Sequence, residues 1–536
     1  MAGDYDGHLA IHPFYSSSTT TMMLSPLPAG TARLYRLCLH LAVGASIWGY
    51  NIGILASILV HPGWRSAMRD PDPSARGTIT AVYYLGTLLA YLFVSHPLAD
   101  WLGRRYAALY GTLALAFGAV VMASSQSLAV MAAGRFCCGL GVGVVSTTVP
   151  LYQSEISPAQ ERGKFVTINH VGFIAGLASG LWVGYGMSFW TEPSGKAWGW
   201  RISILIQLLP AAIFAAGLPF CPDTPRWLVE NGHTERARRV LIWLRQDAVP
   251  PDAIMQELHA ITLEVDSRPR FKRSSLALSL SLFREPPLRA RLWRAFLLQF
   301  LAQMCGAAVM KYYLPTLLKA LGLDTQLALM AGAIEMTIKI GMTIIEMWII
   351  DRIGRRACLV GGSLIMGVAM LINGALPMAY PKNVSKGADV VCIIFIFVYA
   401  MGYGLGLGPA AWVYSSEIFP TAVRARGLNF AASGGSIGSI LVSKIWPLGL
   451  AHWGSGIYFF FMFVNFACAP IVWLFYPETK GRALEDMDEI FGGDAPRPGI
   501  LNNEDLDGDA QDLESELQSP VLGRNQEDEE QARLLS

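Results

Sequence analysis

Asp100-Trp-Leu-Gly-Arg-Arg105 occurs a second time in the chain, as Asp351-Arg-Ile-Gly-Arg-Arg356. The two copies lie 251 residues apart, and two further motif pairs lie 262 and 255 residues apart. Those pairs are Ser154-Glu-Ile-Ser-Pro158 with Ser416-Glu-Ile-Phe-Pro420, and Pro222-Asp-Thr-Pro225 with Pro477-Glu-Thr-Lys480. Because each copy occupies the same place in its half, the repeat predicts two tandem halves of one design.

The chain around these motifs is strongly apolar. Of its 536 residues, 53% are hydrophobic and only 15% are charged, against about 25% charged in a typical soluble domain. Apolar runs of about 20 residues, long enough to cross about 30 Å of hydrocarbon, recur throughout. The predicted spans are 36–59, 78–98, 106–124, 127–151, 164–188, 199–220, 293–318, 328–350, 356–379, 389–413, 426–450 and 455–476. We therefore expect an all-α integral membrane protein with twelve transmembrane helices in two pseudo-symmetric six-helix halves.

The spans divide the chain into five predicted segments. They are a disordered cytosolic N-terminus at 1–33, the first six-helix half at 34–220, a basic cytosolic linker at 221–292, the second half at 293–476 and a cytosolic tail at 477–536. The tail is acidic after 491, and its polar composition predicts disorder there. Parallel halves of this kind are typical of transporters of small solutes.

Arginine and lysine residues are concentrated in the linker and in every second short loop, which predicts that both termini lie in the cytosol. We expect a multi-pass protein of the plasma membrane, with a vacuolar or endosomal membrane as the alternative. The C-terminal residues Glu530, Leu534 and Leu535 are spaced like an acidic dileucine signal, which would bind a sorting adaptor. The first apolar run, rather than a cleaved signal peptide, would direct insertion.

Charged residues at the predicted cytosolic helix ends form a candidate gate that would hold the inner side closed by pairing between the halves. They are Asp100, Arg104, Arg105, Glu155 and Arg162 in the first half, and Asp351, Arg355, Arg356, Glu417 and Arg424 in the second. The alternative is that the arginines only set the topology.

Other classes of function lack their signatures. The eight cysteines form neither a CxxC pair nor a metal-type spacing with histidine. We find no set of nucleophile and base, no phosphate-binding loop and no basic nucleic-acid module. We therefore expect no enzyme, metal, cofactor or nucleic-acid partner, and a monomer whose partners are the lipid bilayer and a small polar solute.

Motifs spread over 34–491 resemble those of the sugar porter family of the major facilitator superfamily, in its fungal-type form. They are Gly134-Arg135-Phe-Cys-Cys-Gly-Leu-Gly-Val-Gly143, Val149-Pro-Leu-Tyr-Gln-Ser-Glu155, Pro222-Asp-Thr-Pro-Arg-Trp-Leu228, Gly408-Pro-Ala-Ala-Trp412 and Pro477-Glu-Thr-Lys-Gly481. The resemblance implies the major facilitator fold, a helical linker domain, and alternating access around a central cavity. It also implies transport of a sugar, a polyol or a related polar metabolite.

One departure from the family concerns energy coupling. Proton-coupled members carry an aspartate in the first span that works against the arginine matching Arg135, but this chain has Asn51, which does not titrate near pH 7. Facilitated diffusion is therefore expected. The alternative is proton symport through His170, because imidazole titrates near physiological pH.

A second departure concerns the solute ligands. By resemblance, Gln303 and Trp412 keep family ligands, whereas His170 replaces a glutamine and Lys339 an asparagine, with Lys311 nearby. Loss of amides should weaken hexose binding.

The eighth span also carries charges. Glu335, Lys339 and Glu346 share one helix face, which should not face lipid. Either Glu335 and Lys339 form an internal salt bridge, or Lys339 binds an anionic group of a sugar acid or hydroxy acid. A non-transporting solute receptor remains an alternative from another class.

Overall fold

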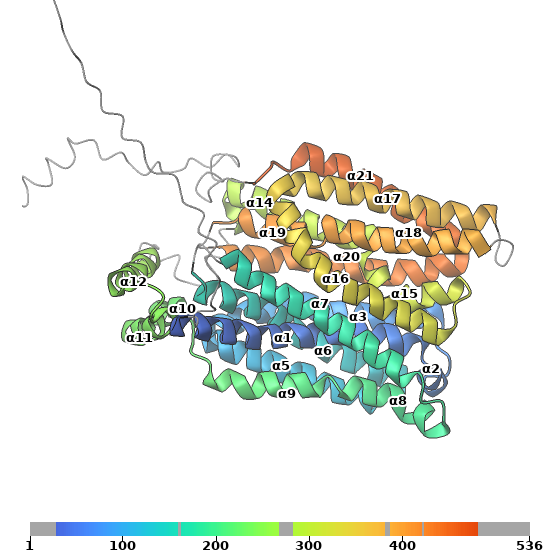
Figure 1. Cartoon of the computed structure of the whole chain (residues 1–536), viewed down its shortest axis with the longest axis horizontal. Coiled ribbons are helices and arrows are strands. Elements are labelled where there is room, and N and C mark those ends of the chain that lie inside the picture. Colours follow the sequence, from blue (N-terminus) through green and yellow to red (C-terminus); the bar gives the residue numbers. More distant parts are fainter. Residues whose placement is uncertain (1–27, 159–161, 267–281, 381–385, 421–422, 481–536) are drawn as a thin grey trace, which may run out of the picture. The chain divides into compact units, whose positions relative to one another are not determined.

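The computed structural model describes residues 28–158, 162–266, 282–380, 386–420 and 423–480, and every regular element in them is a helix (Figure 1). The first half contains α1 (Ala29–Val60), α2 (Pro62–Ala67), α3 (Pro73–Leu89), α4 (Ser95–Leu102), α5 (Arg104–Ala123), α6 (Leu128–Ile156), α7 (Arg162–Met187), α8 (Pro193–Leu205) and α9 (Leu208–Gly217). The linker contains α10 (Pro225–Glu230), α11 (Thr234–Arg245) and α12 (Pro251–Asp266). The second half contains α14 (Pro286–Ala302), α15 (Ala308–Ala320), α16 (Thr325–Ile353), α17 (Arg355–Ala379), α18 (Lys386–Leu405), α19 (Pro409–Glu417), α20 (Arg424–Trp453) and α21 (Ile457–Phe475).

Nine helical stretches among the described residues are long and apolar enough to cross a membrane. One of them, Arg424–Phe475, contains both α20 and α21. Helices α7 and α16 are outside the nine but have 26 and 29 residues, which is also enough to span hydrocarbon. The all-helical membrane architecture is confirmed, while the count of twelve stays a prediction.

Glycines of α6 let the neighbouring helices approach closely. A Cβ atom at Gly139 of α6 would lie 2.1 Å from the Tyr83 carbonyl oxygen of α3. At Gly141 it would lie 2.4 Å from the carbonyl oxygen of Gly111 in α5. Side chains at these points would force the helices apart, so α6 packs against both neighbours through its glycines.

The chain divides into two compact units. The first unit joins the described residues up to Asp266 with Ala307–Ile344 and Ser439–Gly454, and the second contains Ile345–Gly438 and the described residues of Leu276–Gly306 and beyond Ser455. Parts of α15 and α20 belong to the first unit because they bond to α3. The Tyr313 hydroxyl lies 3.5 Å from Thr80 Oγ1, and Lys444 Nζ donates to the Ser74 carbonyl oxygen at 3.3 Å.

Candidate functional site

A buried ion pair fastens the predicted cytosolic ends of α5 and α6 in the first unit. Arg104 Nη2 lies 2.8 Å from Glu155 Oε1, and the two side chains are only 5% and 7% exposed. The other carboxylate oxygen of Glu155 accepts a hydrogen bond from the Thr224 hydroxyl at 2.5 Å. Glu155 therefore ties both helices to the segment that leads into the linker.

The second unit contains the same arrangement at the repeated motifs. Arg355 Nη2 lies 2.9 Å from Glu417 Oε1, and Glu417 Oε2 accepts from the Thr479 hydroxyl at 2.6 Å. The threonines are the third residues of Pro222-Asp-Thr and Pro477-Glu-Thr. All three repeated motifs thus meet at one ion pair in each unit, which explains why they recur together.

The acidic residue before each threonine binds at the start of a helix. Glu478 accepts hydrogen bonds from the backbone N–H groups of Arg355 and Arg356, both at 2.9 Å. In the first unit, Asp223 Oδ2 lies 2.9 Å from Arg105 Nε, at the start of α5. Both helices follow a glycine with positive φ, +87° at Gly103 and +107° at Gly354, a conformation that other residues rarely adopt. Negative charge is favourable at these helix N-termini.

The gate hypothesis expected ion pairs between the halves, but the ion pairs described above lie within each half. Asp100 is 3.8 Å from Arg104 Nη1, and Arg424 Nε donates to the Phe419 carbonyl oxygen at 3.3 Å. The side chains of Arg162 and Asp351 lie outside the described residues, as do Glu530, Leu534 and Leu535. A role of these charges in gating stays a prediction.

Glu155→Gln is expected to destabilise the protein more than Glu417→Gln. Removing one partner of a buried pair costs about 3–5 kcal/mol, whereas exposed pairs contribute about 0–1 kcal/mol. Arg355 and Glu417 are 12% and 25% exposed, so their pair should be the weaker one. Apparent unfolding temperatures of the detergent-purified variants measure the difference, with Thr224→Val as the control that removes only the accepted hydroxyl. Equal decreases in unfolding temperature for Glu155→Gln and Glu417→Gln would contradict the expected difference between the two ion pairs.

A cluster of fully buried polar side chains joins α1 and α6. Arg135 Nη1 donates to Asn51 Oδ1 at 2.8 Å, and Asn51 Nδ2 donates to Gln207 Oε1 at 2.9 Å; all three residues are 0% exposed. The Arg135 guanidinium also lies 4.3 Å above the Tyr83 ring. Arg135 Nε and Nη2 have no hydrogen-bond partner among the described residues. A buried cation is thus held by a neutral amide and an aromatic face.

A cationic cluster, defined as His170, Lys311 and Lys339, lies in the first unit on three different helices. The charges of Lys339 and Lys311 act on the His170 ring, and Lys339 acts on Lys311. The charge of Lys339 acts on Glu335, which lies one turn earlier on the same helix. Glu335 Oε2 has no hydrogen-bond partner among the described residues. Helices α7 and α16 are joined nearby by the Trp182–Thr337 hydrogen bond of 2.9 Å. Two lysine amino groups, one imidazole and one carboxylate therefore influence one another within the first unit.

The remaining predicted ligands belong to the second unit. Gln303 lies in the π-helical turn Gln303–Ala307, whose Gly306 has a φ of +108°, and Tyr403 contacts it. Trp412 is on α19 and is 39% exposed. The five predicted solute ligands therefore divide between the units: His170, Lys311 and Lys339 come together in one, and Gln303 and Trp412 are in the other.

The charged face predicted for the eighth span is also divided. Glu346, on the same helix as Glu335 and Lys339, lies in the second unit and is 2% exposed. A Cβ atom at Gly404 would lie 2.1 Å from Glu346 Oε1, so the carboxylate fits only because α18 has a glycine there. The carboxylate of Glu346 is thus packed against α18.

Residues 37–491, most of the chain, match the family model described as "Sugar (and other) transporter". The chain belongs to this family. Among its relatives, the "Sugar transport protein MST8" of Oryza sativa subsp. japonica is 30% identical, over 86% of this chain and 92% of the relative. The "Quinate permease" of Neurospora terricola is 29% identical, over 86% and 89%. The chain is therefore a sugar-porter-type transporter and not an enzyme.

Solved structures agree on the fold. The xylose transporter XylE from E. coli, in a partially occluded inward-open conformation, superposes with a TM-score of 0.71 at 22% identity, over 84% of this chain and 100% of that chain. This likeness places the sugar porter described here in the major facilitator fold. It is accordingly an integral, multi-pass membrane protein.

Several hydrogen-bonding residues of this sugar porter were not predicted from the sequence. Gln207, Thr224 and Thr479 complete the networks around Asn51, Glu155 and Glu417. Gln207 carried a usable signal, because an amide inside an apolar span needs a hydrogen-bond partner. The two threonines repeat with their motifs, but the repeat alone does not name the carboxylate that each one bonds.

Proposed function

We propose that the protein transports a polyhydroxylated solute that carries a carboxylate, by facilitated diffusion. The observation that carries this proposal is the cationic cluster, in which the charges of Lys311 and Lys339 both act on His170 from two other helices. A solute carboxylate would accept charge-assisted hydrogen bonds from these basic side chains, and such bonds are about twice as strong as neutral ones. A direct Glu335–Lys339 salt bridge is the alternative role for Lys339, whose charge acts on Glu335.

The names of relatives are consistent with this substrate class. The quinate permease cited above is named for a solute that is a hydroxylated ring carboxylate, whereas MST8 is named for sugar transport. A neutral sugar is the second candidate, because Gln303 and Trp412 are retained at family ligand positions. Hydroxyl groups are common to both candidates, so the carboxylate is the feature that separates them.

The absence of proton coupling is proposed from the neutral partner of Arg135. Asn51 accepts a hydrogen bond from Arg135, donates one to Gln207 and holds no proton that can be exchanged near pH 7. We further propose a plasma-membrane location with cytosolic termini, on the arginine distribution. In this arrangement the Arg104–Glu155 and Arg355–Glu417 pairs lie on the cytosolic side and support the helix ends that move during alternating access.

A competition panel tests the substrate class. Purified protein in proteoliposomes would take up a labelled hydroxy acid such as quinate, with unlabelled quinate, gluconate, glucose and myo-inositol as competitors. The acids are expected to compete at concentrations at least about tenfold lower than the neutral compounds, since a hydrogen bond to a charged group contributes about 1.5–3 kcal/mol. Equal or better competition by glucose would overturn the proposal. Binding without uptake of any compound would favour a receptor.

A further inference from the structure

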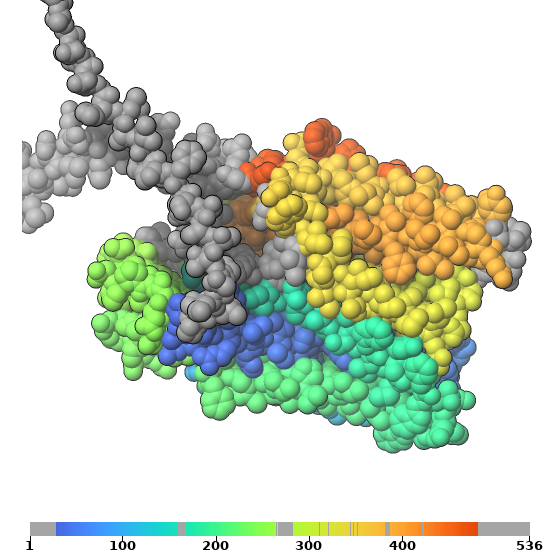
Figure 2. Space-filling model, in the orientation of Figure 1, coloured from blue at the N-terminus to red at the C-terminus, as the bar shows by residue number. Residues whose placement is uncertain are grey.

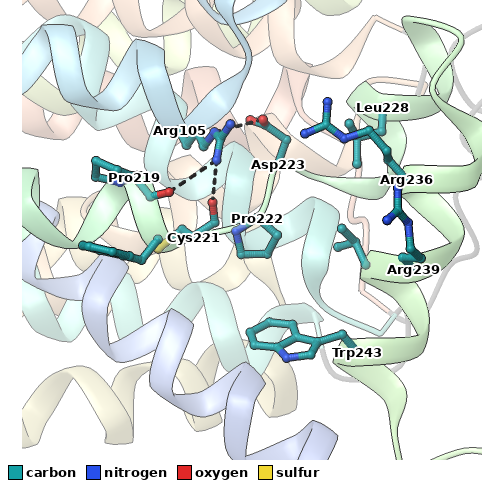
Figure 3. Close-up of a pocket in the computed structure, with 11 residues that line it drawn as sticks. Arg105, Pro219, Cys221, Pro222, Asp223, Leu228, Arg236, Arg239 and Trp243 are labelled. Atoms are coloured by element: carbon teal, nitrogen blue, oxygen red, sulfur yellow. Dashed lines mark hydrogen bonds and ion pairs between the residues drawn. The ribbon is translucent and has the colours of Figure 1, made fainter.

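A cavity of about 550 Å³ lies in the first unit, where the sixth predicted span ends and the linker begins (Figure 3). It is separate from the Asn51–Arg135 group and from the cationic cluster. Its walls come from the start of α5, from the segment after α9 and from α11. The lining residues are Arg105, Pro219, Phe220, Cys221, Pro222, Asp223, Leu228, Arg236, Arg239, Val240 and Trp243.

The polar side of the cavity is basic. Arg105 lies 2.9 Å from Asp223, and its Nη1 also donates to the carbonyl oxygens of Cys221 and Pro219 at 3.1 and 3.4 Å. Arg236 and Arg239 are exposed, and neither forms a salt bridge within the described part of the chain. Three guanidinium groups therefore share one lining carboxylate. Burial raises the pKa of Asp223, and the charges of Arg105, Arg236 and Arg104 oppose that rise.

The other side of the cavity is apolar and continues onto a membrane helix. Phe220 is 89% exposed, and on α9 the side chains of Leu209 and Ile213 are 67% and 55% exposed. Figure 2 shows α9 at the surface in this view. Apolar side chains that point outward from a membrane helix contact lipid chains, so the cavity opens at the edge of a lipid-facing surface.

Trp243 gives the cavity an aromatic wall that is held in place by α1. Arg33 Nη1 donates to the Trp243 carbonyl oxygen at 3.0 Å and to Gln246 Oε1 at 2.7 Å, and its guanidinium lies 5.2 Å from the Trp243 ring centre. Tryptophan is enriched at the level of lipid headgroups, where its ring contacts apolar groups and its N–H contacts water. The position of this wall thus fits the boundary between membrane and cytosol.

We propose that this cavity binds the headgroup of an anionic phospholipid from the cytosolic leaflet. Its phosphate and carboxylate groups would accept hydrogen bonds from Arg236 and Arg239, since guanidinium groups bind such planar or tetrahedral anions with paired donors. The acyl chains would lie along Phe220 and the exposed side of α9. Basic pockets on the cytoplasmic side of membrane helices bind acidic headgroups in this way. The same basic side would also attract a soluble phosphate ester, so the apolar side is the feature that selects a lipid.

Native mass spectrometry of the detergent-purified full chain provides the test. The protein would be titrated with phosphatidylserine, with phosphatidylcholine as the zwitterionic lipid and with glycerophosphoserine as the soluble headgroup. Arg236→Gln and Arg239→Gln would be measured singly and together. Arg238→Gln is the matched control, because Arg238 is on the same helix but does not line the cavity and pairs with Glu235 at 3.8 Å.

Phosphatidylserine is expected to bind the unaltered protein more tightly than phosphatidylcholine does. Each of the two cavity variants should weaken that binding about fivefold, and the double variant about 30-fold, whereas Arg238→Gln should change it by less than about twofold. Equal retention of the two lipids, or an equal loss in Arg238→Gln, would overturn the proposal. If glycerophosphoserine bound as tightly as the lipid, the cavity would be a site for soluble phosphate esters and the lipid assignment would be wrong.

Discussion

Asn51→Asp is expected to make transport depend on a pH gradient, whereas the natural protein is expected not to respond to one. In the structure, Arg135 donates to Asn51 Oδ1, while Asn51 Nδ2 donates to Gln207 Oε1. Arg135 and Gln207 would favour different protonation states of an aspartate at this position. Arg135 favours the ionised carboxylate, whereas the Gln207 carbonyl oxygen needs a donor that only the protonated carboxyl group supplies. The variant would thus hold an exchangeable proton where the natural amide has none.

Solute accumulation in proteoliposomes with an imposed pH difference measures this change. A difference of one pH unit stores about 1.4 kcal/mol, enough for about tenfold accumulation if one proton moves with each solute. The natural protein should equilibrate the solute to a ratio of about one, and Asn51→Asp should exceed this ratio. Concentrative uptake by the natural protein would contradict facilitated diffusion. If His170→Gln then abolished the concentrative uptake, His170 would be the coupling group. If the concentrative uptake survived in His170→Gln, another group would carry the proton.

Much of the architecture could be predicted from the sequence because its causes are local. Apolar length gives the helices, and the repeated motifs predict two related halves. The replacement of an aspartate by Asn51 is visible without any coordinates. Its consequence depends on resemblance, since nothing in the sequence alone pairs residue 51 with residue 135.

Other features depend on contacts between distant parts of the chain and could not be predicted. The sequence places Glu155 and Glu417 among gate charges, but it does not say that each one pairs within its own half and binds a threonine. The neighbours of the charged residues on α16 could not be predicted either. Helical periodicity groups Glu335, Lys339 and Glu346, yet the packing of α16 gives Glu346 a glycine of α18 as its neighbour.

Lys339→Asn is expected to lower uptake of a carboxylated solute at least about tenfold and to raise uptake of a hexose relative to it. The substitution removes one cation from the cationic cluster and restores the amide that resembles the family ligand. Loss of a hydrogen bond to a charged group costs about 1.5–3 kcal/mol, which corresponds to roughly 10-fold to 150-fold in affinity. The measurement is the ratio of quinate uptake to glucose uptake in proteoliposomes, which is insensitive to the amount of folded protein.

Two further variants separate selectivity from stability. Lys319→Asn is the matched control, because Lys319 lies at the end of α15 and its Nζ donates to Thr325 at 2.6 Å, away from the cluster; the uptake ratio should not change. Glu335→Gln removes the carboxylate that acts on Lys339 and leaves the cluster more positive, so it should keep or increase the preference for acids. A structural Glu335–Lys339 pair gives the opposite pattern. Each single variant would then yield less folded protein with an unchanged uptake ratio, and the double variant would recover the yield, because removing both charges leaves neither one buried alone.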